Sequence, residues 1–261
     1  MEFTTHEPER RLLKLMLLGD SDHGKTMTAL ELARRLVPGR WMILDNQGDQ
    51  IEKFVVSHRL NEWADRHHAT VDEAKDLLTY EMAIQQVEKS DHVGLIIDGF
   101  HFFWYGVLDH VNKEAHRRAI ERQKPGKELV VNTVDAWQDS PGGQGGNTVF
   151  SKTLNRLSQC KKHVIVTVRL TADTQYVDGQ WRQVGKKPIF RSGQHMYEFE
   201  LVGLCEKSGS KHVINFDLKY GLCLKLKGRN FYNTFPIHEE PSEDGMELLD
   251  IPRRWMERSD D

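Results

Sequence analysis

Residues 19–26 read Gly19-Asp20-Ser21-Asp22-His23-Gly24-Lys25-Thr26 and match the pattern G-x-x-x-x-G-K-[ST] at every fixed position. Glycines let such a loop turn tightly, so that its backbone N–H groups point inward at phosphate oxygens. The lysine of the pattern reaches the β- and γ-phosphates, and the hydroxyl residue after it binds Mg²⁺. The stretch therefore predicts a phosphate-binding loop formed by all eight residues.

The segments on either side of this loop agree with that interpretation. An apolar run from Leu12 to Leu18 is typical of a buried strand. Behind the loop, Leu30, Ala33 and Leu36 recur at helical spacing, and Val37-Pro38-Gly39 provides a stop signal. Strand, loop and helix thus occur in the order that places phosphates at a helix N-terminus.

The composition sets broad limits. The chain has 261 residues, of which 38% are hydrophobic and 29% charged, which is typical of a soluble globular protein. No apolar stretch approaches the ~18 residues of a membrane span, and the first residues lack a signal-peptide pattern. Three widely spaced cysteines indicate neither a disulfide framework nor a zinc site. We therefore expect a cytoplasmic protein with no membrane partner.

The rest of the chain predicts an α/β fold. Four apolar runs, ending at Leu18 or spanning 41–45, 93–98 and 163–168, fit a mostly parallel sheet with helical crossovers between them. Residues 107–124 favour a helix, and the glycine-rich stretch 140–147 favours a mobile loop. Several later runs are separated by short turns and are expected to form an antiparallel extension of the same sheet. One domain would then span 1–235, followed by a flexible acidic tail at 236–261.

A second nucleotide element follows from the strand 94–98. Gly94-Leu95-Ile96-Ile97-Asp98 is an apolar strand that ends in a carboxylate, as a Walker B element does. We expect this strand to adjoin the strand of the phosphate loop, so that Asp98 and Thr26 hold Mg²⁺ together. Asp45, at the end of another strand, either orients the attacking water or organises a turn through Asx hydrogen bonds.

Other polar residues near strand ends have two readings each. Thr167 and Arg169 end the fourth strand and either sense the γ-phosphate or, for Arg169, pair with a nearby acid. His101 either contacts the site or is a partly buried structural histidine. His58, His67 and His68 lack the spacing of metal ligands and are interpreted as an exposed helix face.

Basic residues gather in the C-terminal region, interleaved with Tyr176, Trp181 and Phe190. This mixture has three interpretations. The surface binds single-stranded nucleic acid through charge and stacking, or one of its arginines acts in trans on a neighbour's nucleotide, or it is a plain solvated surface. The candidate contacts are Arg182, Lys186, Lys187, Arg191 and Arg229, with Lys225 and Lys227 nearby.

The order of these elements resembles the RecA-like P-loop ATPases of phages and prophages that are associated with single-strand annealing and recombination. The resemblance covers roughly residues 10–235 and rests on Gly19–Thr26, Trp41–Asp45, Gly94–Asp98 and Val164–Arg169. It implies a RecA-type core, Mg-ATP hydrolysis, DNA as partner and assembly into rings or filaments, in a bacterial or phage-infected host cell. The family commonly carries an Asp-x-Glu pattern after the second strand, whereas this chain has Asp45-Asn46-Gln47.

From the sequence we expect an ATPase that uses ATP and Mg²⁺ and acts in DNA recombination or annealing. Lys25 would stabilise the transferred phosphoryl group, and Thr26 and Asp98 would hold the metal. Either Asp45 takes the role of the missing glutamate, or hydrolysis is slow. Two alternatives stay open. One is a small-molecule or nucleotide kinase. The other is an ATP-switched module that recruits a partner protein, for which the acidic tail is a candidate contact.

Overall fold

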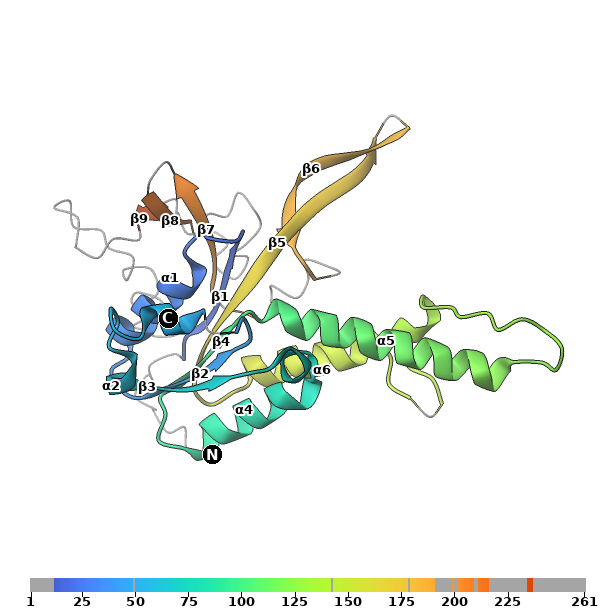
Figure 1. The fold of residues 1–261 in the computed structure, drawn as a ribbon, viewed down its shortest axis with the longest axis horizontal. Coiled ribbons are helices and arrows are strands. Elements are labelled where there is room, and N and C mark those ends of the chain that lie inside the picture. Colours follow the sequence, from blue (N-terminus) through green and yellow to red (C-terminus); the bar gives the residue numbers. More distant parts are fainter. Residues whose placement is uncertain are drawn as a thin grey trace, which may run out of the picture.

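The computed structural model describes residues 12–48, 50–141, 143–177, 179–190, 199, 201–208, 211–215 and 234–236. Within these ranges, the chain forms a mixed sheet with helices on both faces (Figure 1). The elements are β1 (Lys14–Gly19), α1 (Lys25–Leu36), β2 (Trp41–Asp45), η1 (Ile51–Phe54), α2 (Leu60–Trp63), β3 (Ala64–His68), α3 (Val71–Lys75), α4 (Leu77–Lys89), β4 (Gly94–Asp98), α5 (His101–Arg122), η2 (Asp135–Trp137), α6 (Gly146–Ser158), β5 (His163–Val177), β6 (Gln180–Pro188), β7 (Leu201–Ser208), β8 (Lys211–Asn215) and β9 (Thr234–Pro236).

The sheet follows the order β3-β2-β4-β5-β1-β7-β8-β9, and β6 pairs with β5 outside this path. The strands from β3 to β7 in this order are mutually parallel, whereas β8 and β9 add in antiparallel fashion. A mostly parallel α/β sheet with antiparallel C-terminal strands is therefore confirmed. Parallel strands covered on both faces must be apolar throughout, and β1, β2 and β4 are buried along their whole length.

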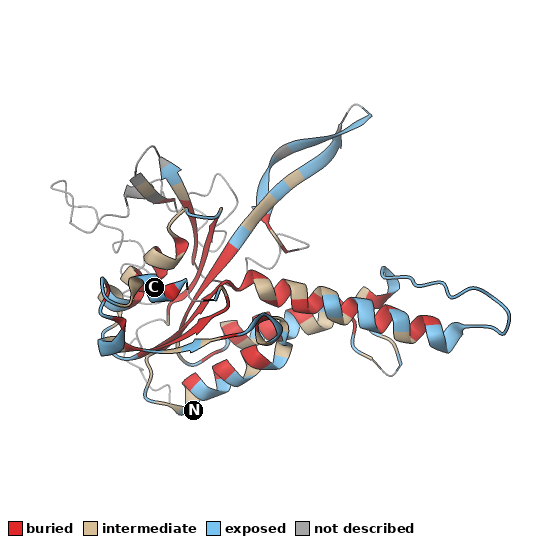
Figure 2. Ribbon diagram, viewed as in Figure 1, coloured by how far each residue is buried: buried red, intermediate tan, exposed pale blue. Residues whose placement is uncertain are grey.

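Two apolar cores lie on opposite faces of this sheet (Figure 2). Leu30 and Ala33 of α1 pack in one core with the alternate β1 residues Leu15 and Leu17. The other core joins α4, α5 and α6 and is rich in aromatic rings; Phe100 stacks on Phe103 with ring centroids 5.0 Å apart. Alternate residues of one strand thus serve different cores, which fixes the pairing register of the sheet.

Several local expectations need correction. His67 and His68 belong to edge strand β3, and His58 is only 4% exposed and pairs with Glu31 at 3.1 Å, so these histidines do not form an exposed helix face. β7 runs parallel to β1, although short turns in the sequence had indicated an antiparallel strand. The β4 strand does not adjoin β1 either, because β5 lies between them.

Helix α5 and the segment after it extend away from the sheet (Figure 1). The buried Glu114 accepts from Arg117 and Arg118, and Arg118 also donates to the carbonyl oxygens of Asp135 and Gln138 at 2.5 and 2.6 Å. Asp139 accepts from the amide of Gly145 at 2.7 Å. The described part of the glycine-rich stretch is therefore tied to its surroundings, in contrast to the mobile loop that its composition favours.

Strand β5 continues without a break into a long hairpin with β6, whereas the sequence indicated two separate strands. Gly179 has a φ of 79° at the turn, a conformation that glycine adopts at little cost. The hairpin projects from the sheet and is largely exposed (Figure 2). Arg191, Lys225, Lys227 and Arg229 lie outside the described residues, as does the acidic tail beyond Pro236.

Candidate functional site

The predicted phosphate loop, residues 19–26, connects β1 to α1 at the carboxyl end of the parallel strands. Gly24 immediately precedes α1 with a φ of 80°, and a side chain there would lie 3.4 Å from the ring of His212. A Cβ at Gly19 would lie 2.7 Å from the carbonyl oxygen of Cys205. Close approach of β7 therefore requires glycine at position 19, whereas the positive φ favours glycine at position 24. The first amides of α1 have no partner within the helix, and they are donors for an anion at this end.

Lys25 begins α1 and is 8% exposed. Its ammonium group donates to the carbonyl oxygen of Asp20 at 2.6 Å, which folds the side chain back over the loop. Burial lowers the pKa of Lys25, and the nearby charge of Arg169 lowers it further. Burial makes the charged form of a lysine less stable, and an anionic ligand beside the ammonium group stabilises that form again. This is the electrostatic behaviour needed of a phosphate-binding lysine.

Thr26 and Asp98 meet although 72 residues separate them in the chain. The hydroxyl of Thr26 donates to both carboxylate oxygens of Asp98, at 3.0 and 2.9 Å. Asp98 is fully buried, and that burial raises its pKa against the lowering effect of hydrogen bonds from Thr167 and Thr26. Hydroxyl and carboxylate oxygens are ligands that Mg²⁺ prefers. The pair can hold a divalent cation beside the loop.

Thr167 holds Asp98 in place. Its hydroxyl donates to Oδ1 of Asp98 at 2.6 Å and accepts from the amide of Gly99 at 2.8 Å. Thr167 lies on β5, and its own carbonyl oxygen accepts from the amide of Phe100 at 2.8 Å. The strand between the loop and the Walker B strand therefore supplies the group that orients the carboxylate. Arg169, two residues further, is exposed and is the register partner of Gly19.

Asp45 is also fully buried, in register with Asp98 on the neighbouring strand. Its Oδ1 accepts from the amide of Gln47 at 2.9 Å, and its Oδ2 lies 3.2 Å from Nδ1 of His68. The first contact is an Asx-type turn contact, and the second joins β2 to the neighbouring strand β3. The carboxylate of Asp45 thus organises the turn after β2, while Gln47 lies against Gly99, whose Cβ would come 2.7 Å from Cγ of Gln47.

His101 follows the Walker B strand at the start of α5. It is 2% exposed, and its Nδ1 has no hydrogen-bond partner among the described residues. Burial lowers the pKa of His101 to about 4, and the charges of Arg169 and Lys25 act in the same direction. The ring is therefore neutral at physiological pH, as expected of a buried structural histidine that lies near the phosphate loop.

Sequence reasoning missed the support that the C-terminal strands give to the loop. Nδ1 of His23 lies 3.2 Å from the carbonyl oxygen of Cys205 on β7, and Nε2 of His212 on β8 lies 2.9 Å from that of Asp22. Asp22 has a φ of 60°, an uncommon conformation that such contacts stabilise. No local sequence pattern predicts these contacts, because they depend on the pairing of β7 with β1.

The basic residues of the hairpin have different surroundings. Lys186 forms an ion pair with Asp20 of the phosphate loop, and Lys187 pairs with Asp173 on β5 at 2.9 Å. Arg182 is exposed near the hairpin tip, beside the exposed rings of Tyr176 and Trp181. Phe190, which the sequence grouped with these aromatic residues, is 2% exposed and belongs to the core. It is therefore not available for stacking on a nucleic acid.

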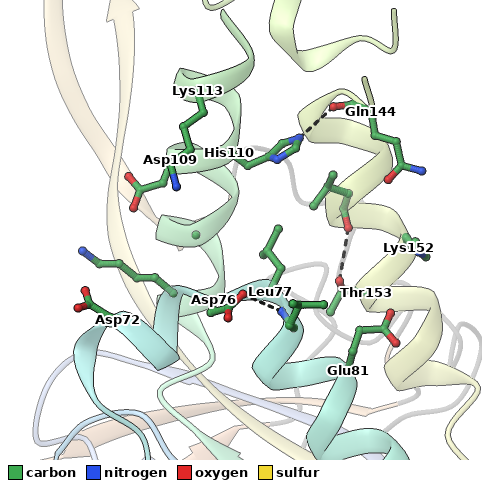
Figure 3. A pocket seen from close by; sticks show the side chains of 14 residues that line it. Asp72, Asp76, Leu77, Glu81, Asp109, His110, Lys113, Gln144, Lys152 and Thr153 are labelled. Carbon is green, nitrogen blue, oxygen red and sulfur yellow. Dashed lines mark hydrogen bonds between the residues drawn. The ribbon is translucent and has the colours of Figure 1, made fainter. Parts of the chain in front are cut away.

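A separate pocket of about 670 Å³ lies among α3, α4, α5 and α6 (Figure 3). Its lining carries acids such as Asp109 and Glu81 beside bases such as Lys113 and Lys152, and His110 bonds to the carbonyl oxygen of Gln144 at 2.9 Å. It contains none of the residues that the sequence singled out as a nucleotide site. The described part of the chain contains no cluster of three or more metal-binding side chains and no helix suited to crossing a membrane.

Comparison with known proteins gives little beyond the geometry. No family model matches the chain, and no curated protein matches its sequence. Among solved structures, the crystal structure of the RadB recombinase aligns with 77% of this chain and 79% of its own, at 14% identity and a TM-score of 0.40. The site described above therefore has to be interpreted from its own contacts.

Proposed function

We propose that this protein is a RecA-like P-loop ATPase that binds Mg-ATP, hydrolyses it and acts on DNA in recombination or annealing. The single observation that carries the nucleotide assignment is the contact of Thr26 with Asp98. A loop hydroxyl and a buried strand-end carboxylate have no reason to converge for stability alone, since burying a carboxylate is costly. Beside a phosphate loop, the pair has the ligand chemistry of a magnesium site.

The roles of the residues follow from their positions. The amides from Asp22 to Lys25 cradle the phosphates, and Lys25 stabilises charge on the transferred phosphoryl group. Thr26 and Asp98 would hold Mg²⁺, which would neutralise charge on the phosphate oxygens. Thr167 keeps the Asp98 carboxylate aimed at Thr26.

The test of this assignment is direct binding. Wild-type protein is titrated calorimetrically with ATP in the presence of Mg²⁺ and again with EDTA, and the turnover of ATP is measured in parallel. Lys25→Ala should abolish turnover, since catalysis of phosphoryl transfer is mostly positioning and electrostatics. Near-normal turnover in that variant, or absence of magnesium-dependent nucleotide binding by the wild type, would reject the assignment.

The contacts of Asp45 favour a second candidate function, an ATP-switched recruitment module. Both oxygens of Asp45 already have partners in the turn and in His68, so neither is a free general base. With Gln47 in place of the family's glutamate, slow hydrolysis is the natural consequence. Turnover far below 1 s⁻¹, together with tight nucleotide binding, favours this switch, because ordinary kinases turn over at roughly 1–100 s⁻¹.

DNA, with single strands favoured, and a homo-oligomeric assembly complete the proposal. Its support in the fold is the projecting hairpin, whose exposed Tyr176 and Trp181 offer stacking surfaces beside Arg182. The experiment is ATP turnover with and without single-stranded DNA, read together with mass in solution. Stimulation and assembly support the proposal. Indifference to DNA in a monomeric protein points instead to the small-molecule kinase considered above.

A further inference from the structure

The hairpin formed by β5 and β6 contacts the phosphate loop through one side chain. Lys186 lies on β6, opposite Ala172 of β5, and its ammonium group is ion-paired with the carboxylate of Asp20. Asp20 is the residue directly after β1, 166 positions earlier in the chain. A lysine of the projecting arm is therefore placed at the loop of its own chain.

The contact is particular to this lysine. Successive side chains of a strand point to opposite sides, and the next residue, Lys187, pairs with Asp173 on the hairpin itself. The side chain of Lys186 is 51% exposed and that of Asp20 is 29% exposed, so the pair is accessible to a dissolved anion. An exposed lysine–carboxylate pair is worth only about 0–1 kcal/mol and is easily exchanged for a stronger partner.

Two ammonium groups meet at Asp20. Lys25 donates to its carbonyl oxygen, and Lys186 pairs with its carboxylate. β5, the strand that carries the hairpin, also carries Thr167, which orients Asp98 at the metal end of the site. The lysine of a phosphate loop reaches the β- and γ-phosphates in P-loop proteins. Because Lys186 contacts the same loop residue as Lys25, it adds a second cation near that end of the phosphate chain.

We propose that Lys186 is a second phosphate-binding lysine, which leaves Asp20 and binds the terminal phosphate when a nucleoside triphosphate occupies the loop. The inference rests on the proposed function of the loop. A terminal phosphate carries more negative charge than one carboxylate, so it displaces Asp20 as partner of the ammonium group. Lys186 therefore distinguishes a bound triphosphate from a diphosphate. Its contact with the phosphate loop, and with it the position of the hairpin that carries Tyr176 and Trp181 near its tip, then depends on which of the two is bound.

The experiment is equilibrium titration with Mg-ATP and Mg-ADP, without a turnover readout. Lys186→Ala should weaken ATP binding about tenfold, the value of one charge-assisted contact of roughly 1.4 kcal/mol, and change ADP binding less than about twofold. Lys187→Ala is the matched control and should leave both affinities unchanged. Asp20→Asn removes the competing carboxylate and should strengthen ATP binding, but not when combined with Lys186→Ala.

The outcomes separate the inference from the function on which it rests. Equal loss of both affinities in Lys186→Ala, no loss of either, or weaker ATP binding in Asp20→Asn overturns the role of Lys186 while leaving the P-loop assignment intact. A wild-type protein that binds neither nucleotide overturns both together. Loss confined to ATP, with the Lys187→Ala control unchanged, establishes Lys186 as a triphosphate contact.

Discussion

The hydroxyl of Thr167 should be among the most costly polar groups to remove from this protein. Thr167→Val keeps the shape of the side chain but deletes the group that donates to Asp98 at 2.6 Å and accepts from Gly99 at 2.8 Å. Losing a hydrogen bond to a charged group costs about 1.5–3 kcal/mol, and a buried amide without a partner costs about 1–3 kcal/mol. We therefore expect the free energy of unfolding to fall by roughly 3–5 kcal/mol.

Urea denaturation at neutral pH measures this loss, and Thr153→Val on α6 is the matched control. Thr153 is 4% exposed, but its hydroxyl only reaches the carbonyl oxygen of Val149 at 3.4 Å, one turn earlier in the same helix. Its replacement should cost less than about 1 kcal/mol, because such a back-bond adds little to a helix. Thr167→Ser retains the hydroxyl and should recover most of the lost stability. The reasoning is refuted if Thr167→Val and Thr153→Val destabilise the protein equally.

Three further predictions test the site and the fold. Asp98→Asn should remove magnesium-dependent ATP binding while leaving the folded state intact, as measured by calorimetry and circular dichroism; retained magnesium dependence contradicts the assigned ligand. His163 accepts from the amide of Leu13 at 2.9 Å, and burial lowers its pKa to about 4, so the unfolded chain binds the proton more tightly. The contribution of His163 to the free energy of unfolding is then fully present above pH 6.5 and is lost as the pH falls toward 4, by about 2 kcal/mol at pH 5. Urea denaturation of the wild type and of His163→Asn, above pH 6.5 and at pH 5, measures this loss. An equal loss in the variant contradicts the prediction. Glu114→Ala leaves the buried Arg118 without its carboxylate and should lower the free energy of unfolding by roughly 3 kcal/mol. Glu121→Ala, at the exposed end of the same network, should lower it by less than about 0.5 kcal/mol. Similar melting temperatures for the two variants argue against a role for Glu114 in fixing the segment after α5.

The sequence alone determined the elements whose signals are local. The spacing of glycines and lysine from Gly19 to Thr26 predicted the phosphate loop, and the apolar run before Asp98 predicted a buried strand that ends in a carboxylate. The strand–loop–helix order and the buried strand are confirmed, because the backbone conformation of a glycine turn and the apolar character of a strand buried on both faces depend on neighbouring residues. The carboxylate of Asp98 and the hydroxyl of Thr26 are within hydrogen-bond distance, as the two motifs together require.

The tertiary structure decided what lies between and around these motifs. It places β5 between β1 and β4, so that Thr167 orients Asp98, and it pairs β7 with β1, so that the carbonyl oxygen of Cys205 lies against Gly19. It also brings Lys186 to Asp20. Each contact joins residues separated by more than 60 positions, and no local pattern encodes such a pairing. The order of strands in the sheet is set by how the two cores pack as a whole, and this is why these partners become visible only in the folded chain.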